Sequence, residues 1–162
     1  MPAPPDAPLN PVRGVPLRAR EQAFAANLHV VSGIDSDAVL DVWASAIAAP
    51  GHAGPPAWVH GDLHPANILV HDGRISGVID FGDITAGDPA ADLSVAWMLL
   101  PADCRGAFRD AYRAAGGHAE GDDTWARARG WALALSLAFL AHSADNPVIA
   151  AIGRRTIGAV LG

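Results

Sequence analysis

The sequence predicts a mainly helical protein that carries one small β-hairpin. Helix signals dominate the second half, where capping residues and prolines separate apolar runs from Asp88 to Leu161. The hairpin is indicated by Asp72-Gly73, which stands between the short runs Ile68–Val70 and Arg74–Ile79. Asp-Gly supplies the positive φ angles that a tight hairpin turn needs. With 162 residues, of which 51% are hydrophobic, the chain is long enough for one domain with a substantial core.

The N-terminal third is predicted to hold a linker and two helices. Residues 1–16 contain six of the thirteen prolines and are interpreted as an extended lead-in or linker, with the folded domain at residues 17–162. Arg18 to Val31 has moderate helical character. Ser36 is expected to cap a second helix that ends near Ala49, before residues 50–56 break the pattern. Val39, Leu40, Trp43 and Ile47 should lie on one face of this helix.

Four helices are expected after the hairpin. Asp88 should cap the first, with Pro89 in its first turn, and this helix should run to Leu100. The other three are expected at Ala102 to Ala115, from Asp122 or Asp123 to about His142, and from Asn146-Pro147 to about Leu161.

Composition and charge exclude several classes of function. Eleven basic and seventeen acidic residues give a net charge of −6 without any basic run, so nucleic acid is not an expected partner. Cys104 is the single cysteine, which rules out an intrachain disulfide and fits a reducing compartment. The longest apolar run, Trp131 to Ala141, is much shorter than the ~20 residues of a membrane-spanning helix, and the N-terminus lacks the pattern of a signal peptide. We therefore expect a cytoplasmic protein without a membrane segment.

Two short motifs carry the chemistry. Residues 60–67, His-Gly-Asp-Leu-His-Pro-Ala-Asn, have the His-x-Asp-x-x-x-x-Asn spacing of a kinase catalytic loop, and Asp80-Phe81-Gly82 follows after the hairpin. Phosphoryl transfer needs one carboxylate that accepts or orients the attacking hydroxyl. It also needs an amide and a second carboxylate that hold Mg²⁺ against the phosphates, because this hard cation prefers oxygen ligands.

The sequence resembles the aminoglycoside phosphotransferase family of the protein-kinase-like superfamily. The resemblance rests on HGDLHPANIL, VIDFGD and GDPAADL, which together are far more specific than any one triplet. It implies that Asp62 is the catalytic aspartate and that Asn67 and Asp80 are the Mg²⁺ ligands. His64 stands where protein kinases place a lysine that touches the transferred phosphate, so it is assigned a supporting role in cofactor binding.

Two further residues are expected to support the site. By the same resemblance, Asp92 would anchor the backbone of the catalytic loop from the start of a helix. His60 is interpreted as a buried, hydrogen-bonded loop histidine and not as a base or ligand. Asp62 is expected near Asp80 in an acidic site that nothing in the chain neutralises, so that its removal should not cost stability.

The resemblance covers about residues 10–162 but only the C-terminal lobe of the family's fold. In that fold, ATP lies between a β-rich N-terminal lobe and this helical lobe, and the first lobe supplies a phosphate-covering loop and a lysine. All eleven basic residues here are arginine, and neither Gly-x-Gly-x-x-Gly nor a P-loop is present. We therefore expect the N-terminal ATP lobe to be absent. The chain would then be a naturally short homologue, a gene fragment, or a fragment made by engineering or proteolysis.

The expected function is ATP- and Mg²⁺-dependent phosphorylation of a hydroxyl group on an aminoglycoside or a similar small molecule. The activity is expected to be incomplete or lost without an N-terminal lobe or a partner chain that supplies one. The negative net charge would attract a cationic acceptor, although ordinary soluble proteins often carry as much.

Two functions of other classes stay open. A non-catalytic module could use the acidic pocket of the C-terminal lobe to bind a small cationic or polyhydroxyl ligand without turning over ATP. A metallophosphoesterase is the second, because HGDLHP is similar to the Gly-Asp-x-His-Gly element of that class. That class also needs an upstream Asp-x-His and a downstream Gly-Asn-His-Asp/Glu, and the sequence contains neither.

Overall fold

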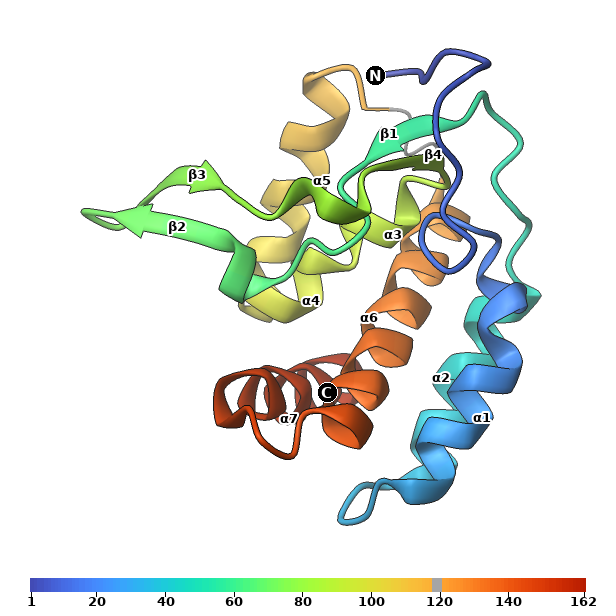
Figure 1. Cartoon of the computed structure of the whole chain (residues 1–162), viewed down its shortest axis with the longest axis vertical. Coiled ribbons are helices and arrows are strands. Elements are labelled where there is room, and N and C mark those ends of the chain that lie inside the picture. The colour runs from blue at the N-terminus through green and yellow to red at the C-terminus, as the bar shows by residue number, and fades with distance from the viewer. Residues whose placement is uncertain (118–120) are drawn as a thin grey trace.

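The computed structural model describes residues 1–117 and 121–162. It is mainly helical, as predicted, and contains small antiparallel sheets (Figure 1). The α-helices are α1 (Glu21–Val30), α2 (Ser36–Ala48), α3 (Ala90–Leu93), α4 (Val95–Leu99), α5 (Arg105–Ala114), α6 (Asp122–His142) and α7 (Pro147–Leu161). Short 3-10 helices are η1 (Leu17–Arg20), η2 (Pro65–Asn67), η3 (Phe81–Asp83) and η4 (Ala102–Cys104). The strands are β1 (Ala57–Val59), β2 (Ile68–His71), β3 (Arg74–Val78) and β4 (Thr85–Gly87).

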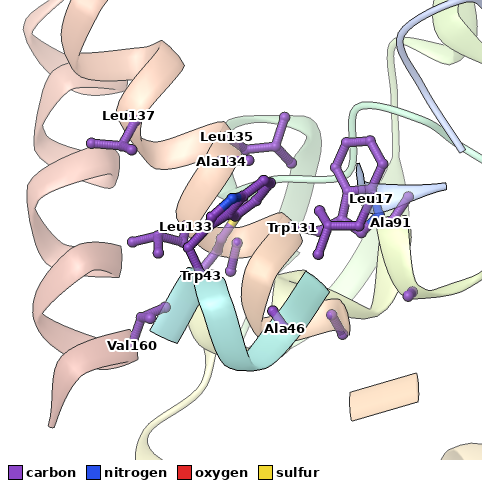
Figure 2. Packing of buried hydrophobic residues seen from close by; sticks show 14 of the residues in the cluster. Leu17, Trp43, Ala46, Ala91, Trp131, Leu133, Ala134, Leu135, Leu137 and Val160 are labelled. Carbon is purple, nitrogen blue, oxygen red and sulfur yellow. The ribbon is translucent and has the colours of Figure 1, made fainter. Parts of the chain in front are cut away.

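Helix α6 forms the centre of the fold. It contacts α1, α2, α3, α4 and α7, and Figure 1 shows it running between the α1–α2 pair and the elements that follow the hairpin. Its sequence is apolar around most of its circumference, which is typical of a helix that is buried on several sides. Trp131 is 1% exposed and lies in the middle of the core beside Leu17 and Trp43 (Figure 2). Phe24 of α1 stacks on Trp43 of α2 with ring centroids 3.9 Å apart.

The predicted hairpin is confirmed. Strands β2 and β3 pair antiparallel with His71 opposite Arg74, so that Asp72-Gly73 forms the two-residue turn. Both turn residues have positive φ angles, 49° and 72°, as a tight hairpin requires. The hairpin projects from the helical body (Figure 1), which leaves Val70 and Ile75 more than half exposed.

A second small sheet, β1–β4, was missed by the sequence reasoning. Trp58 stands opposite Ala86 in an antiparallel register. Each strand has only three residues, shorter than the usual ~5–6, and is too brief to show an alternating pattern. This sheet matters for the site because residues 60–67 follow β1 directly and the Asp80-Phe81-Gly82 motif precedes β4.

Residues 1–16 contain no helix and run along this second sheet. Trp58 N donates to Met1 O at 3.0 Å, and Ala86 N donates to Pro8 O at 3.0 Å. The segment therefore makes backbone contacts with both strands that flank the motifs.

The ends of two predicted helices differ from the structure. Asp35, and not Ser36, caps α2, because its Oδ1 accepts a hydrogen bond from Ala38 N at 3.1 Å. Leu40 is 47% exposed, whereas Ala46 is buried where α2 crosses α6 at close range. The helix expected from Asp88 to Leu100 is divided at Ser94, whose Oγ donates to Ala91 O at 2.6 Å and competes with the helical hydrogen bonds.

A buried ion pair joins α6 to the turn before α3. Arg127 Nε donates to Asp88 Oδ2 at 2.7 Å, and both side chains are 5% exposed. Asp88 Oδ1 also accepts from Ala90 N at 3.0 Å, although Pro89, and not the predicted Asp88, is the residue directly before α3. The described helices include none with the length and apolar character needed to cross a membrane.

Candidate active site

Asp92 holds the backbone of the predicted catalytic loop. Its Oδ2 accepts from His60 N at 2.6 Å and its Oδ1 accepts from Gly61 N at 3.0 Å. Burial raises the pKa of Asp92 above its ordinary value, even though both hydrogen bonds favour the ionised form. Gly61 has a φ of 83°, and a Cβ there would overlap the Asp83 carbonyl oxygen, so glycine alone fits this turn. These contacts are the ones that the predicted anchoring role of Asp92 requires.

His60 is buried and links the two motifs. Its Nε2 lies 2.9 Å from Ile79 O, and its Nδ1 accepts from Asp62 N at 3.3 Å. Because a carbonyl oxygen only accepts, these partners assign the proton of the neutral ring to Nε2. The ring also packs against Phe81, with centroids 4.7 Å apart. Both nitrogens are thus used within the protein.

Asp62, the predicted catalytic aspartate, is held on both of its carboxylate oxygens. Oδ2 lies 3.3 Å from His64 Nε2, and Oδ1 lies 2.9 Å from Arg13 Nη2 in an ion pair that is not aligned as a hydrogen bond. Burial raises the pKa of Asp62. The hydrogen bond from His64 and the charge of Arg13 together lower it by more than burial raises it, so the pKa lies below its ordinary value. The group therefore stays ionised at neutral pH.

His64 is 6% exposed and lies beneath the site. Its Nδ1 accepts from Ala66 N at 3.3 Å, which leaves the proton on Nε2 toward Asp62. Phe139 of α6 packs against the ring edge-on, with centroids 5.2 Å apart. The described polar contacts of His64 are therefore with Asp62, Ala66 and Asn67, all within the loop, and its assignment to a cofactor stays a prediction.

Asn67 and Asp80 offer oxygen atoms of the kind that Mg²⁺ prefers. Asn67 Nδ2 donates to Asp62 O at 2.9 Å, which leaves Oδ1 available for a ligand. Ile79 N donates to Asn67 O at 3.0 Å, so the backbone directly before Asp80 is bonded to Asn67. Asp80 has φ 63° and ψ 62°, a left-handed conformation that is uncommon for residues other than glycine and that aspartate adopts more readily than most. Its side chain is exposed, and the described part of the chain donates no hydrogen bond to it. One amide and one carboxylate oxygen fit this cation.

Arg13 belongs to the site and was missed by the sequence reasoning. Besides its ion pair with Asp62, its Nε donates to Asp83 Oδ2 at 3.2 Å. The expectation that nothing in the chain neutralises Asp62 is therefore wrong. Arg13 is the only basic residue among residues 1–16 and is flanked by the turn-forming Asn10-Pro11 and Gly14. This pattern is the signal that could have distinguished it from a linker residue.

A metallophosphoesterase would hold its metals in a cluster of His and carboxylate side chains, which differs from the site around Asn67 and Asp80. Within residues 1–117 and 121–162, no three His, Cys, Asp or Glu side chains come together as such a cluster. The candidate metal ligands here are one amide and one carboxylate, which leaves the remaining positions around Mg²⁺ to water and nucleotide phosphates.

Comparison with known proteins identifies the family. The model described as "Phosphotransferase enzyme family" matches residues 2–131, which is most of the chain. The chain belongs to the phosphotransferase enzyme family. No curated protein matches the sequence.

Solved structures similar to this phosphotransferase family member are macrolide 2'-phosphotransferases. A macrolide 2'-phosphotransferase type I has 21% sequence identity and a TM-score of 0.58, over 89% of this chain and 50% of that chain. The apoenzyme of macrolide 2'-phosphotransferase MphH from Brachybacterium faecium has 25% identity and a TM-score of 0.54, over 91% of this chain and 50% of that chain. The chain thus spans about half the length of each solved structure.

Proposed function

We propose that this member of the phosphotransferase enzyme family transfers the terminal phosphoryl group of ATP to a hydroxyl group of a small molecule. The arrangement around Asp62 supports this most directly. Asn67 is hydrogen-bonded to the backbone of Asp62, and Ile79 ties Asp80 to Asn67. These two backbone links support a site in which a base, an amide and a second carboxylate act together, as phosphoryl transfer needs.

In the proposed reaction, Asp62 orients the acceptor hydroxyl and receives its proton. Each carboxylate oxygen has two lone pairs, so contact with Arg13 or His64 leaves one free for the acceptor. A low pKa makes Asp62 a weak base, which suffices because the loose transition state of phosphoryl transfer depends on positioning more than on full deprotonation.

Asn67 and Asp80 would hold Mg²⁺, which neutralises charge on the nucleotide phosphates when it is bound. Both residues supply the hard oxygen atoms that this ion requires. His60 supports them indirectly, because its bond to Ile79 O fixes the backbone that carries Asp80.

We further propose that an N-terminal lobe, or a partner chain that supplies one, completes the ATP site. Exposed apolar side chains gather on the hairpin and the segment after it, beside Asp80. They are Leu69, Val70, Ile75, Val78, Ile79, Phe81 and Ile84, each at least 38% exposed. A run of exposed apolar side chains next to a site marks a surface that is usually covered. The half-length match to solved phosphotransferases, and the absence of lysine among these residues, support an ATP site that is completed from outside them.

The proposed acceptor is a hydroxyl-bearing antibiotic or a similar molecule, such as an aminoglycoside or a macrolide. Macrolides are included because both solved structures described above are macrolide 2'-phosphotransferases. Acceptor choice is assigned to the helices from Ala102 to Leu161. The second candidate function is a non-catalytic module that binds a small molecule, and the same half-length match favours it.

The test is an assay of ADP release. The purified chain is incubated with Mg²⁺, ATP and a panel of macrolides, aminoglycosides and amino alcohols, alone and with the segment encoded upstream of Met1 where the reading frame continues. We expect acceptor-dependent release that Asp62→Asn abolishes, and only when that segment is supplied. Turnover that is insensitive to Asp62→Asn would overturn the proposed site. Acceptor binding without any turnover would favour the non-catalytic module.

A further inference from the structure

The loop from Asn10 to Gly14 has a defined conformation that presents Arg13. Asn10 Oδ1 accepts hydrogen bonds from Val12 N at 2.9 Å and from Arg13 N at 3.1 Å, which closes a turn around the proline. Gly14 then takes a φ of 63°, a left-handed conformation that reverses the chain just after Arg13. The turn is therefore specified by its own side chains.

The same loop is fastened to β4 and to the turn after it. Asn10 N donates to Thr85 Oγ1 at 2.8 Å, and Thr85 Oγ1 donates to Pro8 O at 3.0 Å. Asp88 N donates to Gly14 O at 2.8 Å. Thr85 is fully buried, so its hydroxyl group is shielded from water in its bonds with Asn10 and Pro8. Arg13 thus extends from a loop that is fixed at both ends.

Arg13 connects two carboxylates that come from different parts of the site. Its Nη2 reaches Asp62 Oδ1 at 2.9 Å, and its Nε donates to Asp83 Oδ2 at 3.2 Å. Asp83 is itself held, because Asn10 Nδ2 donates to its Oδ1 at 3.1 Å. The planar guanidinium carries donors in a rigid fork, which suits a bridge between two carboxylates.

Arg13 differs from an ordinary surface ion pair in its burial. The Arg13 and Asp62 side chains are each 22% exposed, whereas Arg113 and Asp110 of α5 form a pair that is 57% and 78% exposed. A half-buried pair on a fastened loop keeps its geometry far better than two mobile side chains on a helix surface.

We propose that Arg13 is a positioning residue for Asp62, which holds one carboxylate oxygen in place while His64 holds the other. This inference rests on the proposed function of Asp62, and it adds to that function a residue from the segment interpreted as a linker. With Arg13 beside Oδ1 and His64 beside Oδ2, we expect the Asp62 side chain to keep one staggered rotamer. If the Asp62 side chain already has its reactive orientation before the acceptor binds, the reaction does not have to include the entropy cost of fixing it.

The test measures the χ1 rotamer of Asp62 by NMR, through three-bond couplings to its carboxyl carbon, in the nucleotide-free chain. The wild type should show the couplings of a single rotamer. Arg13→Gln removes the charge and should give averaged couplings, and Arg13→Lys should restore the single rotamer in part, because an ammonium group cannot bridge both carboxylates. Arg113→Gln is the matched control and should leave Asp62 unchanged.

Unchanged Asp62 couplings in a folded Arg13→Gln protein would overturn the proposal. If that variant does not fold, Asp83→Asn replaces it, because this change removes one anchor of Arg13 and should also cause partial averaging. An unchanged rotamer there would overturn the proposal equally. The NMR measurement contains no nucleotide and is therefore independent of the ADP-release assay. Averaged Asp62 couplings in Arg13→Gln together with no ADP release would retain the positioning role and reject the kinase function.

Discussion

His60 and Ile79 are joined across the site, with His60 Nε2 2.9 Å from the carbonyl oxygen of Ile79, nineteen positions later in the chain. The bond connects the loop that carries Asp62 to the segment that carries Asp80. The two motifs are therefore linked directly, although the hairpin between them projects outward (Figure 1).

Replacing His60 with alanine should loosen this link. The change leaves Ile79 O and Asp62 N without their partners, at a cost of about 1–3 kcal/mol in the free energy of unfolding. Hydrogen exchange of the Asp62 amide should become faster. His52→Ala is the control, because His52 Nε2 also contacts a carbonyl oxygen, that of Pro55, but in an exposed loop. Equal effects of the two variants would contradict the linking role of His60.

Asp92 and Asp62 should differ in what they contribute to stability. Asp92→Ala strands the buried amides of His60 and Gly61, which should cost about 1–3 kcal/mol or more and lower the melting temperature by about 3–10 °C. Asp62→Ala should cost about 1 kcal/mol or less, because its ion pair is partly exposed and Arg13 keeps Asp83. Thermal melts of both variants decide this. The anchoring role fails if Asp92→Ala melts like the wild type while Asp62→Ala melts early.

The buried pair of Arg127 and Asp88 should be among the most sensitive points of the fold. Arg127→Met leaves the Asp88 carboxylate buried without its counter-charge, and we expect a loss of about 3–5 kcal/mol. Arg113→Met removes an exposed pair and should cost about 1 kcal/mol or less. Chemical denaturation of both variants measures the difference. A loss below about 1 kcal/mol for Arg127→Met would mean that Asp88 finds another partner or takes up a proton.

Asp62 should make stability depend on pH in acid. Its pKa is lowered in the folded protein, since the His64 hydrogen bond and the Arg13 charge outweigh the raising effect of burial. The unfolded chain binds a proton at this residue near pH 4, whereas the folded protein binds it only at a lower pH. The stabilisation by the ionised group is therefore present above about pH 4 and lost as the pH falls through the folded pKa.

The measurement is the free energy of unfolding of wild type minus that of Asp62→Asn, followed by denaturation from about pH 5 to about pH 2. Taking the difference cancels the groups that do not interact with Asp62. The pKa of Asp92 is raised in part by the charge of Asp62, so that part of its contribution stays in the difference. The difference should shrink on acidification. A constant difference would show that Asp62 has no lowered pKa.

Local sequence signals predicted the parts of the fold that depend on near neighbours. Asp72-Gly73 specified the hairpin turn, and Asn146 specified the start of α7 by accepting from Ile149 N at 3.2 Å. The division at Ser94 was missed because a serine hydroxyl can point to solvent or to the preceding turn, and only packing decides between these. The three-residue strands β1 and β4 were missed because their pairing depends on residues that are distant in the chain.

The sequence predicted the site residues that lie within the two short motifs, and it did not predict those that lie outside them. The motif spacing identified Asp62, Asn67 and Asp80 as candidates, but no spacing relates Arg13 to Asp62, because they come from segments far apart in the sequence. Arg127 and Asp88 illustrate the same limit, with 39 positions between them. Contacts of this kind depend on the packed fold, which a single sequence does not display.

The central claim is that Asn67 and Asp80 bind the metal of a phosphotransferase site next to Asp62. It is tested most directly by titrating the labelled chain with Mn²⁺, with and without ADP, and following paramagnetic broadening of backbone amides. Broadening should centre on Asn67 and Asp80, strengthen with ADP, and disappear in Asp80→Asn, whereas Asp110→Asn on α5 should have no effect. Binding should be weak without nucleotide, because two protein ligands leave the ion mostly hydrated. Tight, nucleotide-independent binding that requires His60 and His64, or broadening centred away from Asp80, would contradict the claim.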